Sequence, residues 1–180
     1  MTATAAGSAA WPHWVWVALR TDHAGETGAV WIYRGILAAS RDPEVVAFAR
    51  AHLATESRHL HEIAAILPPA RRSRLVGLWR VLGFVTGFAP ALVGRRAVFA
   101  TIAAVETFVD AHYQQQIDRL RREGVDAALA AALDAWRGDE VAHRDDAARR
   151  VHAAPPLWID GWTRLVQAGS AFAVAVARRV

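Results

Sequence analysis

Apolar residues recur at alternating steps of four and three along four stretches of the chain. This spacing places them on one face of an α-helix. The stretches run from Leu19 to Leu37, from Val45 to Ile66, from Phe99 to Leu120 and from Leu129 to Ala147. We therefore predict four amphipathic helices, and each apolar face turns polar near its middle.

Proline and glycine separate these stretches. Pro43 lies between the first and the second and suits the first position of a new helix. The second stretch stops at Pro68, and the third ends around Gly124. Beyond Pro155, the apolar run over residues 158–180 predicts one more helix, which is too short in its apolar part to span a bilayer.

The connection between the second and third helices is long. It contains about 30 residues rich in Leu, Val, Phe, Trp and Gly, enough for the crossover of a ferritin-like bundle. A chain of 180 residues that is 54% apolar, with only 12 Gly and 7 Pro, suits one helical domain. We predict an all-α fold, a ferritin-like four-helix bundle with a long crossover between helices 2 and 3 and an additional C-terminal helix. The domain is expected over residues 18–180, after a flexible segment at 1–17.

The charge and hydropathy of the chain indicate which partners and which location to expect. The net charge is +4 and all 21 basic residues are arginine, which favours an anionic partner. The arginines are scattered beside apolar segments, so a membrane surface is preferred to nucleic acid. The first twenty residues do not resemble a secretory signal, which leads us to expect a cytoplasmic protein. Arg80 and Pro90 interrupt the most apolar stretch, so we do not expect it to cross a membrane.

The polar positions within the apolar faces form a repeated pattern. Glu26 precedes a Glu-x-x-His motif by 30 positions, and Glu106 precedes another by 34. The two motifs are Glu56-x-x-His59 and Glu140-x-x-His143. A Glu and a His three apart share a helix face, and two such pairs with two further carboxylates match the template of ferritin-like dinuclear metal proteins. Because the chain has no cysteine, only Asp, Glu and His can be the metal ligands.

Chance is the alternative explanation. The composition gives only about 0.3 Glu-x-x-His pairs by random placement. The two pairs, together with Glu26 and Glu106, also lie on the faces that the apolar residues define as buried. A buried group of carboxylates is tolerable when metal ions balance its charge. We therefore interpret the six residues as metal ligands.

Other polar residues have less certain roles. Asp139 is our hypothesis for the hydrogen-bond partner of His59, because metal-bound histidines usually donate their second nitrogen to a carboxylate. Asp145 and Asp22 are weaker candidates for such a role. His52 has no counterpart in the other half, which favours packing. Tyr113, two turns after Glu106, is either a gate for electron or proton transfer or an ordinary core tyrosine.

Several segments resemble one known family. They are DHAGETGAVWIYRG (22–35), ESRHL (56–60), LWRVLGFVTGFAPALVGRRAVFATIAAVETFVDAHYQQQI (78–117) and RGDEVAHRDDA (137–147). They are similar to the demethoxyubiquinone hydroxylases, which are di-iron monooxygenases of ubiquinone biosynthesis in the ferritin-like superfamily. The resemblance covers roughly residues 18–180 and departs from the family at Thr27 and Trp31.

The resemblance implies two Fe ions per chain and a site beside His112 and Tyr113. The implied ligands are Glu26, Glu56, His59, Glu106, Glu140 and His143. The implied reaction is O₂-dependent hydroxylation of a polyprenyl benzoquinone with NADH-derived electrons. Since that substrate lives in the bilayer, we expect peripheral docking on the inner face of the cell membrane. The crossover from Leu75 to Val98 would be the interfacial segment, through Trp79, Leu82, Phe84, Val85 and Phe88 beside Arg80, Arg95 and Arg96.

Three other functions stay open at this point. The same site would also suit hydroxylation or oxidation of another lipid or quinone. Ferritin-like bundles also store iron, although this basic chain with an apolar crossover makes a poor cage wall. A metal-free membrane scaffold is the fourth possibility, against which the intact ligand set argues. Other ubiquinone-biosynthesis proteins and a second copy of the chain are further candidate partners.

Overall fold

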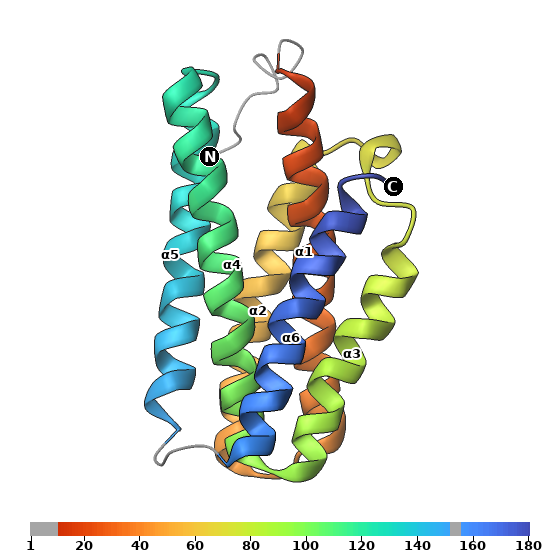
Figure 1. The fold of residues 1–180 in the computed structure, drawn as a ribbon, viewed down its shortest axis with the longest axis vertical. Coiled ribbons are helices and arrows are strands. Elements are labelled where there is room, and N and C mark those ends of the chain that lie inside the picture. The colour runs from red at the N-terminus through yellow and green to blue at the C-terminus, as the bar shows by residue number, and fades with distance from the viewer. Residues whose placement is uncertain (1–10, 152–155) are drawn as a thin grey trace.

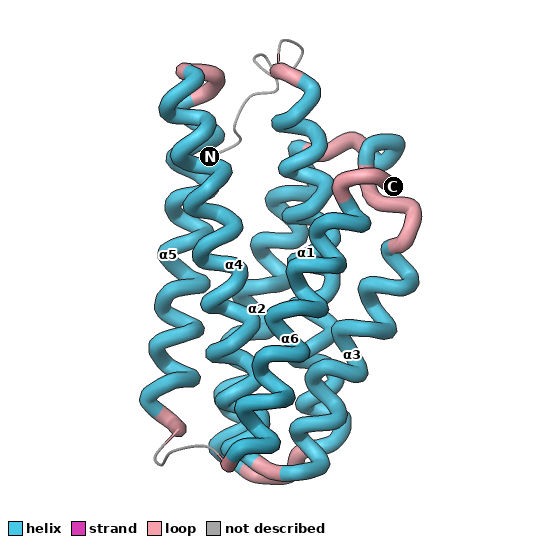
Figure 2. The backbone as a smooth tube through the Cα atoms, viewed as in Figure 1, coloured by secondary structure: helices cyan, strands magenta, loops and turns pink. Residues whose placement is uncertain are grey.

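The computed structural model describes residues 11–151 and 156–180, which form an upright bundle of helices (Figure 1). The described residues contain α-helices, one 3-10 turn and no strand, as Figure 2 shows. The α-helices are α1 (His13–Ala39), α2 (Pro43–Ile66), α3 (Val76–Val93), α4 (Arg95–Glu123), α5 (Ala127–Arg149) and α6 (Leu157–Ala177). The 3-10 turn η2 is Pro69–Arg71. The all-α prediction is confirmed.

The four predicted amphipathic helices are α1, α2, α4 and α5. They form two hairpins, α1 with α2 and α4 with α5, which stand side by side in Figure 1. Their apolar faces make two buried clusters at different heights of the bundle, one around Phe48 and Phe99 and one around Ile63 and Leu133. The polar middle of each face lies between these clusters.

Local sequence signals set the helix ends. Asp42 caps α2 by accepting hydrogen bonds from the amides of Glu44 and Val45, and Pro43 occupies the first turn. Gly124 ends α4 with a left-handed backbone at φ 61°, which glycine adopts without a steric penalty. Helix α1 begins at His13, five residues before the boundary predicted at residue 18. Residues 1–10 of the predicted N-terminal segment lie outside the described part of the chain.

The crossover is a helix, α3, that lies along α1 (Figure 1). Glycines allow the two backbones to touch: a Cβ at Gly83 would collide with the carbonyl of Gly28, and a Cβ at Gly87 with that of Ile32. Trp79 was predicted to face the membrane interface, but it is buried because α3 packs closely on α1, where Trp79 lies in a cluster with Ala24. Its indole Nε1 donates to Ser73 Oγ at 3.0 Å. Helix α3 is nevertheless long and apolar enough to cross a membrane by length and composition, which the sequence interpretation did not expect.

Helix α6 is the predicted C-terminal helix, and it lies in front of the bundle between α4 and α3 in Figure 1. Exposed large apolar side chains of the described residues are confined to α3, α6 and the C-terminal Val180. We call those of α3 and α6 the apolar surface; its members are Leu78, Val81, Leu82, Val85, Leu92, Val93, Leu157, Trp158, Leu165 and Phe172. The other described helices, in contrast, leave no large apolar side chain exposed.

Candidate metal centre

The four bundle helices bring all six predicted ligands together midway along the bundle. The contributors are Glu26 from α1, Glu56 and His59 from α2, Glu106 from α4, and Glu140 and His143 from α5. Every one of the six is buried. The apolar clusters above and below fix the rotation of each helix, and this rotation aims its polar residues at the bundle axis.

The six residues form two overlapping groups that could each hold a metal ion. One group is Glu26, Glu56, His59 and Glu140; the other is Glu56, Glu106, Glu140 and His143. Within each group the potential ligand atoms lie within 4.8 Å of one another. Glu56 and Glu140 belong to both groups, so their carboxylates are placed to bridge two ions.

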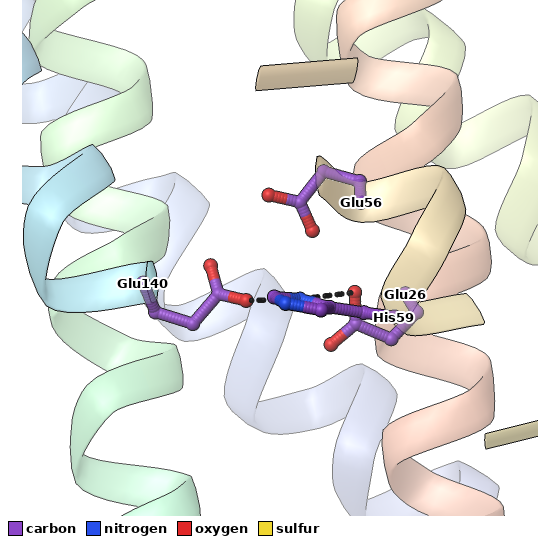
Figure 3. Close-up of side chains that lie close together, drawn as sticks. All are labelled: Glu26, Glu56, His59 and Glu140. Carbon is purple, nitrogen blue, oxygen red and sulfur yellow. Dashed lines mark hydrogen bonds and ion pairs between the residues drawn. The ribbon is translucent and has the colours of Figure 1, made fainter. Parts of the chain in front are cut away.

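Figure 3 shows the first group, with His59 of α2 between the carboxylates of Glu26 and Glu140. Nδ1 of His59 lies 3.0 Å from Oε1 of Glu140 and 4.0 Å from Oε2 of Glu26. In the second group, Nδ1 of His143 lies 2.9 Å from Oε1 of Glu56 and 3.5 Å from Oε2 of Glu140. Each histidine therefore turns the same ring nitrogen toward the shared carboxylates.

Several of these atoms are buried without a hydrogen-bond partner, which tests whether the residues suit a metal. They are Oε2 of Glu26, both carboxylate oxygens of Glu56 and Nδ1 of His143, which faces Glu56 closely but not in hydrogen-bond geometry. A buried polar atom without a partner is costly in a folded protein. Acceptor atoms that converge on one space are satisfied together by divalent cations, so the donor set suits hard or borderline metals such as iron or manganese.

The ionisation of the site reflects the crowding of its carboxylates. Burial, and then the charge of Glu140, raises the pKa of Glu26 to about 7. The same two causes hold the pKa values of Glu56 and Glu106 well above the usual range. Glu140 differs: burial would raise its pKa, but its close contact with His143 and its hydrogen bond with His59 lower it to about 2. Burial would lower the pKa of His59, but its hydrogen bond to Glu140 and the charge of Glu26 raise it to about 9.

Two buried tyrosines hold the carboxylates that are not shared. Tyr113 of α4 donates to Oε1 of Glu26 at 2.6 Å, and Tyr33 of α1 donates to Oε1 of Glu106 at 3.2 Å. Each tyrosine lies seven positions after the glutamate of its own helix and donates to the glutamate of the other hairpin. Tyr113 therefore lies at the site, while its part in electron or proton transfer stays a prediction. From the sequence, Tyr33 was assigned no role at the site, although a tyrosine follows the unshared glutamate at the same Glu-x₆-Tyr spacing in both halves.

The predicted partner of His59 is in place. Oδ2 of Asp139 lies 3.0 Å from Nε2 of His59 and accepts a hydrogen bond from Arg58 at 2.7 Å. The functional weight of this contact stays a prediction. Asp145 instead pairs with Arg144 at 2.9 Å and takes no part at the centre.

His52 was expected to have a packing role, but it also makes polar contacts beside the centre. Its ring stacks on His143 with centroids 4.0 Å apart, and its Nδ1 lies 3.2 Å from the hydroxyl of Tyr33. On its far side, Nε2 of His52 lies 3.3 Å from Oδ2 of the partly exposed Asp146. This chain of contacts was missed because His52 has no counterpart in the first half of the repeat.

His112 adjoins the centre without contacting its carboxylates. Nε2 of His112 lies 3.1 Å from Thr21 Oγ1, 2.9 Å from Gln116 Nε2 and 3.3 Å from Asp22 Oδ1. Asp22 also accepts a hydrogen bond from Gln116 at 2.6 Å. Asp22 therefore supports His112, and is not a partner of either ligand histidine.

A cavity of about 340 Å³ opens beside the carboxylates. Its lining includes Glu26, Glu56, Glu106 and Glu140, and most of its other lining residues belong to α1, α3, α4 and α6. The walls are mostly apolar, with Val105 and Phe108 from α4 and Leu82 from α3. His112 and Asp22 line it as well. The four glutamates of the centre therefore face a mostly apolar space that α1, α3, α4 and α6 enclose.

The helical bundle, its crossover and the two Glu-and-His groups define a ferritin-like protein with a candidate dinuclear metal centre. The pattern of the family described as "Ubiquinone biosynthesis protein COQ7" matches residues 14–177. The chain belongs to this family.

Two relatives illustrate the similarity. The chain is 38% identical over 169 residues to "3-demethoxyubiquinol 3-hydroxylase" of Rhodospirillum rubrum, covering 90% of this chain and 76% of the relative. It is 31% identical over 165 residues to "NADPH-dependent 3-demethoxyubiquinone 3-hydroxylase, mitochondrial" of Dictyostelium discoideum, with the same coverage of 90% and 76%. The family that the sequence segments resemble is thereby confirmed.

Proposed function

We propose that this protein is an O₂-dependent hydroxylase that adds a hydroxyl group to the benzoquinone ring of a polyprenylated demethoxyubiquinone. The observation that carries the proposal is the arrangement of two overlapping ligand groups whose four glutamates line a mostly apolar cavity. A metal-dependent hydroxylase combines metal ligands that hold the O₂-activating ions with a water-poor pocket for the ring, and the candidate ligands here line a mostly apolar cavity. The names of the two relatives agree with this reaction.

Two iron ions would be held by the six ligands. Glu26 and His59 would serve one ion, Glu106 and His143 the other, and Glu56 and Glu140 would bridge them. Bound iron would supply the reduction of O₂ and the transfer of one oxygen atom to the ring. Burial and repulsion between the carboxylates raise the pKa values of Glu26, Glu56 and Glu106, which favours their protonated forms when no metal is bound. Metal binding would therefore release protons.

The other residues around the centre orient and isolate the reaction. Tyr113 and Tyr33 hold the unshared carboxylates at fixed angles, and Asp139 fixes the ring of His59. The apolar walls exclude water from the ring of the substrate. His112, held by Asp22 and Gln116, presents a polar edge to the cavity for a quinone oxygen. Electrons would come from a reduced nicotinamide nucleotide, either NADH or NADPH.

The apolar surface on α3 and α6 would place the protein on a membrane. Both helices also line the cavity, so a lipid-soluble quinone would enter between them directly from the bilayer. Arg80 and Arg96 are exposed beside this surface and suit anionic headgroups. Arg95, which the sequence interpretation grouped with them, pairs with Glu44 at 3.3 Å. We place the protein in the cytoplasm, peripheral on the inner face of the cell membrane.

The test combines metal content with product analysis. The wild-type chain, loaded anaerobically with Fe(II), should bind about two irons per chain and convert demethoxyubiquinone to a product heavier by one oxygen atom when O₂ and NADH or NADPH are supplied. Glu140→Ala should lose both the iron binding and the conversion of demethoxyubiquinone. Metal binding with oxidation of a different quinone or lipid would point to another substrate, and iron loading far above two per chain would point to storage. Absence of stoichiometric metal binding would overturn the proposal.

A further inference from the structure

A second apolar hollow lies next to the cavity that contains the carboxylates. It has a volume of about 360 Å³ and lies between the C-terminal end of α3, at Pro90 and Val93, and the N-terminal end of α6, at Trp158 and Gly161. Of the residues that the structure describes, only Trp162 and Leu165 line both spaces. These two side chains are therefore the partition between the two hollows.

The two residues of the partition are held very differently. The indole Nε1 of Trp162 donates to Oγ1 of the buried Thr101 on α4 at 2.8 Å, and Thr101 in turn donates to the carbonyl of Ala97 at 2.7 Å. The ring of Trp162 also packs on the buried cluster that includes Val166. The side chain of Leu165, in contrast, is 64% exposed on the outer side of α6. Trp162 is the fixed part of the partition, and Leu165 borders the surface.

The size of the first cavity limits what it can enclose. Its volume lies near the lower end of the range of about 300–1,000 Å³ that small-molecule sites occupy. A substituted quinone ring and the first part of a polyprenyl tail fill such a space, so the remaining tail must continue elsewhere. The second hollow is apolar and would suit more isoprene units, but Trp162 blocks the way to it.

We propose that Trp162 determines how much of the polyprenyl tail the protein encloses. It separates the cavity from the second hollow, so the tail turns outward over Leu165 and leaves between α3 and α6 toward the membrane. This inference rests on the proposed function, because it assumes a tailed quinone as the substrate. Trp162 would affect which tail lengths bind, and it belongs to neither ligand group of the centre.

The experiment compares quinones that carry one, two, three or four isoprene units. Equilibrium binding to the metal-free protein and kcat/KM of the iron-loaded protein are both measured, for the wild type and for Trp162→Ala. In the wild type, affinity should rise with the first units and then level off. In Trp162→Ala the two hollows join, and affinity should go on rising, by about tenfold or more between two and four units, since each buried carbon adds to binding.

Three further variants keep the test decisive. Trp158→Ala removes a residue that lines only the second hollow and should keep the wild-type length profile. Thr101→Val removes the acceptor that holds the indole and should move the profile part of the way toward that of Trp162→Ala. At Gly161 an added Cβ meets no atom within 4 Å, so Gly161→Phe in the Trp162→Ala background should fill the second hollow and restore the wild-type profile. Thermal unfolding checks that each variant is folded.

The outcomes separate this inference from the proposed function. If none of the quinones binds to the wild type or is hydroxylated by it, the proposed function fails. If they bind and react but Trp162→Ala and Thr101→Val, both folded, keep the length profile of the wild type, the role of Trp162 is refuted. A continued rise in affinity in Trp162→Ala, reversed by Gly161→Phe, supports it.

Discussion

The two halves of the candidate metal centre offer the same ligands but support them differently. In the half with Glu26 and His59, Tyr113 bonds the carboxylate at 2.6 Å and Asp139 bonds the imidazole at 3.0 Å. In the half with Glu106 and His143, Tyr33 bonds the carboxylate at a longer 3.2 Å, and the imidazole is supported by the stacked ring of His52.

This difference teaches that an internal repeat can fix the ligands of a site without fixing their support. Short hydrogen bonds from fixed partners restrict a ligand more than a stacked ring does. We therefore expect the ion beside Glu26 and His59 to be held more tightly than the ion beside Glu106 and His143. The following predictions test this comparison, beginning with the largest effect.

Removal of a shared carboxylate should weaken binding of both metal ions, so no difference between the two halves remains to be measured. Because Glu56 and Glu140 belong to both groups, Glu56→Ala and Glu140→Ala should each bind fewer than one iron per chain and lose measurable hydroxylation. Elemental analysis after gel filtration gives the metal content. Glu123 is an exposed glutamate at the end of α4, so Glu123→Ala is the matched control and should keep the wild-type metal content. Two irons retained in Glu140→Ala would contradict the bridging role.

Removal of an unshared carboxylate should separate the two halves. Glu26→Ala should lose the tighter ion and Glu106→Ala the weaker one, so each variant should retain about one iron and lose at least about 100-fold in kcat, since both ions serve the reaction. Titration with Fe(II) under anaerobic conditions should give a higher affinity for the ion that remains in Glu106→Ala. Equal affinities in the two variants would show that the supports do not matter.

Changes to the supports should have smaller effects that fall on one ion each. Tyr113→Phe and Asp139→Asn should weaken the ion beside His59, whereas Tyr33→Phe and His52→Phe should weaken the ion beside His143, by about 10- to 100-fold in affinity. His52→Phe keeps an aromatic ring on His143 but loses both polar contacts of His52. Competition with a chelator measures each step, and an effect of His52→Phe on the first ion would count against the assignment.

The smallest effect concerns the stability of the metal-free protein. The pKa of Glu26 is about 7 in the folded chain against 4.5 as its ordinary value, so between these pH values the folded state binds more protons than the unfolded state. The contribution of this carboxyl is therefore lost as the pH rises from about 5 to about 7.5. Denaturant unfolding with a chelator present should show stability falling over this range. Glu26→Gln should flatten the curve, and an unchanged slope would reject this pKa.

Much of the bundle could be predicted from the sequence because its signals are local. The apolar spacing defined four helices, and Pro43 and Gly124 marked helix ends that the structure places within a residue or two. The six ligand positions were visible because each lies on an apolar face, and the structure brings all six together. Their binding of iron is the step that metal analysis has to establish.

The remaining features depend on contacts between distant segments. The burial of Trp79 follows from the close approach of α3 to α1, which glycines such as Gly83 permit but which no periodicity announces. The contact of His52 with Tyr33 and Asp146 joins α2 to α1 and α5, so no spacing within one helix indicates it. The partition at Trp162 likewise depends on where α6 settles against α4.

The sharing of ligands between hairpins also has a consequence for the order of events during synthesis. The group that contains Glu26 and His59 is completed by Glu140 from α5, which leaves the ribosome more than 80 residues after His59, since 140 − 59 = 81. Tyr113, which fixes Glu26, also arrives late. Domains emerge N-terminal end first at about 5–20 residues per second. A half-made chain therefore lacks the complete set of candidate ligands, and we expect metal binding only once the second hairpin has docked.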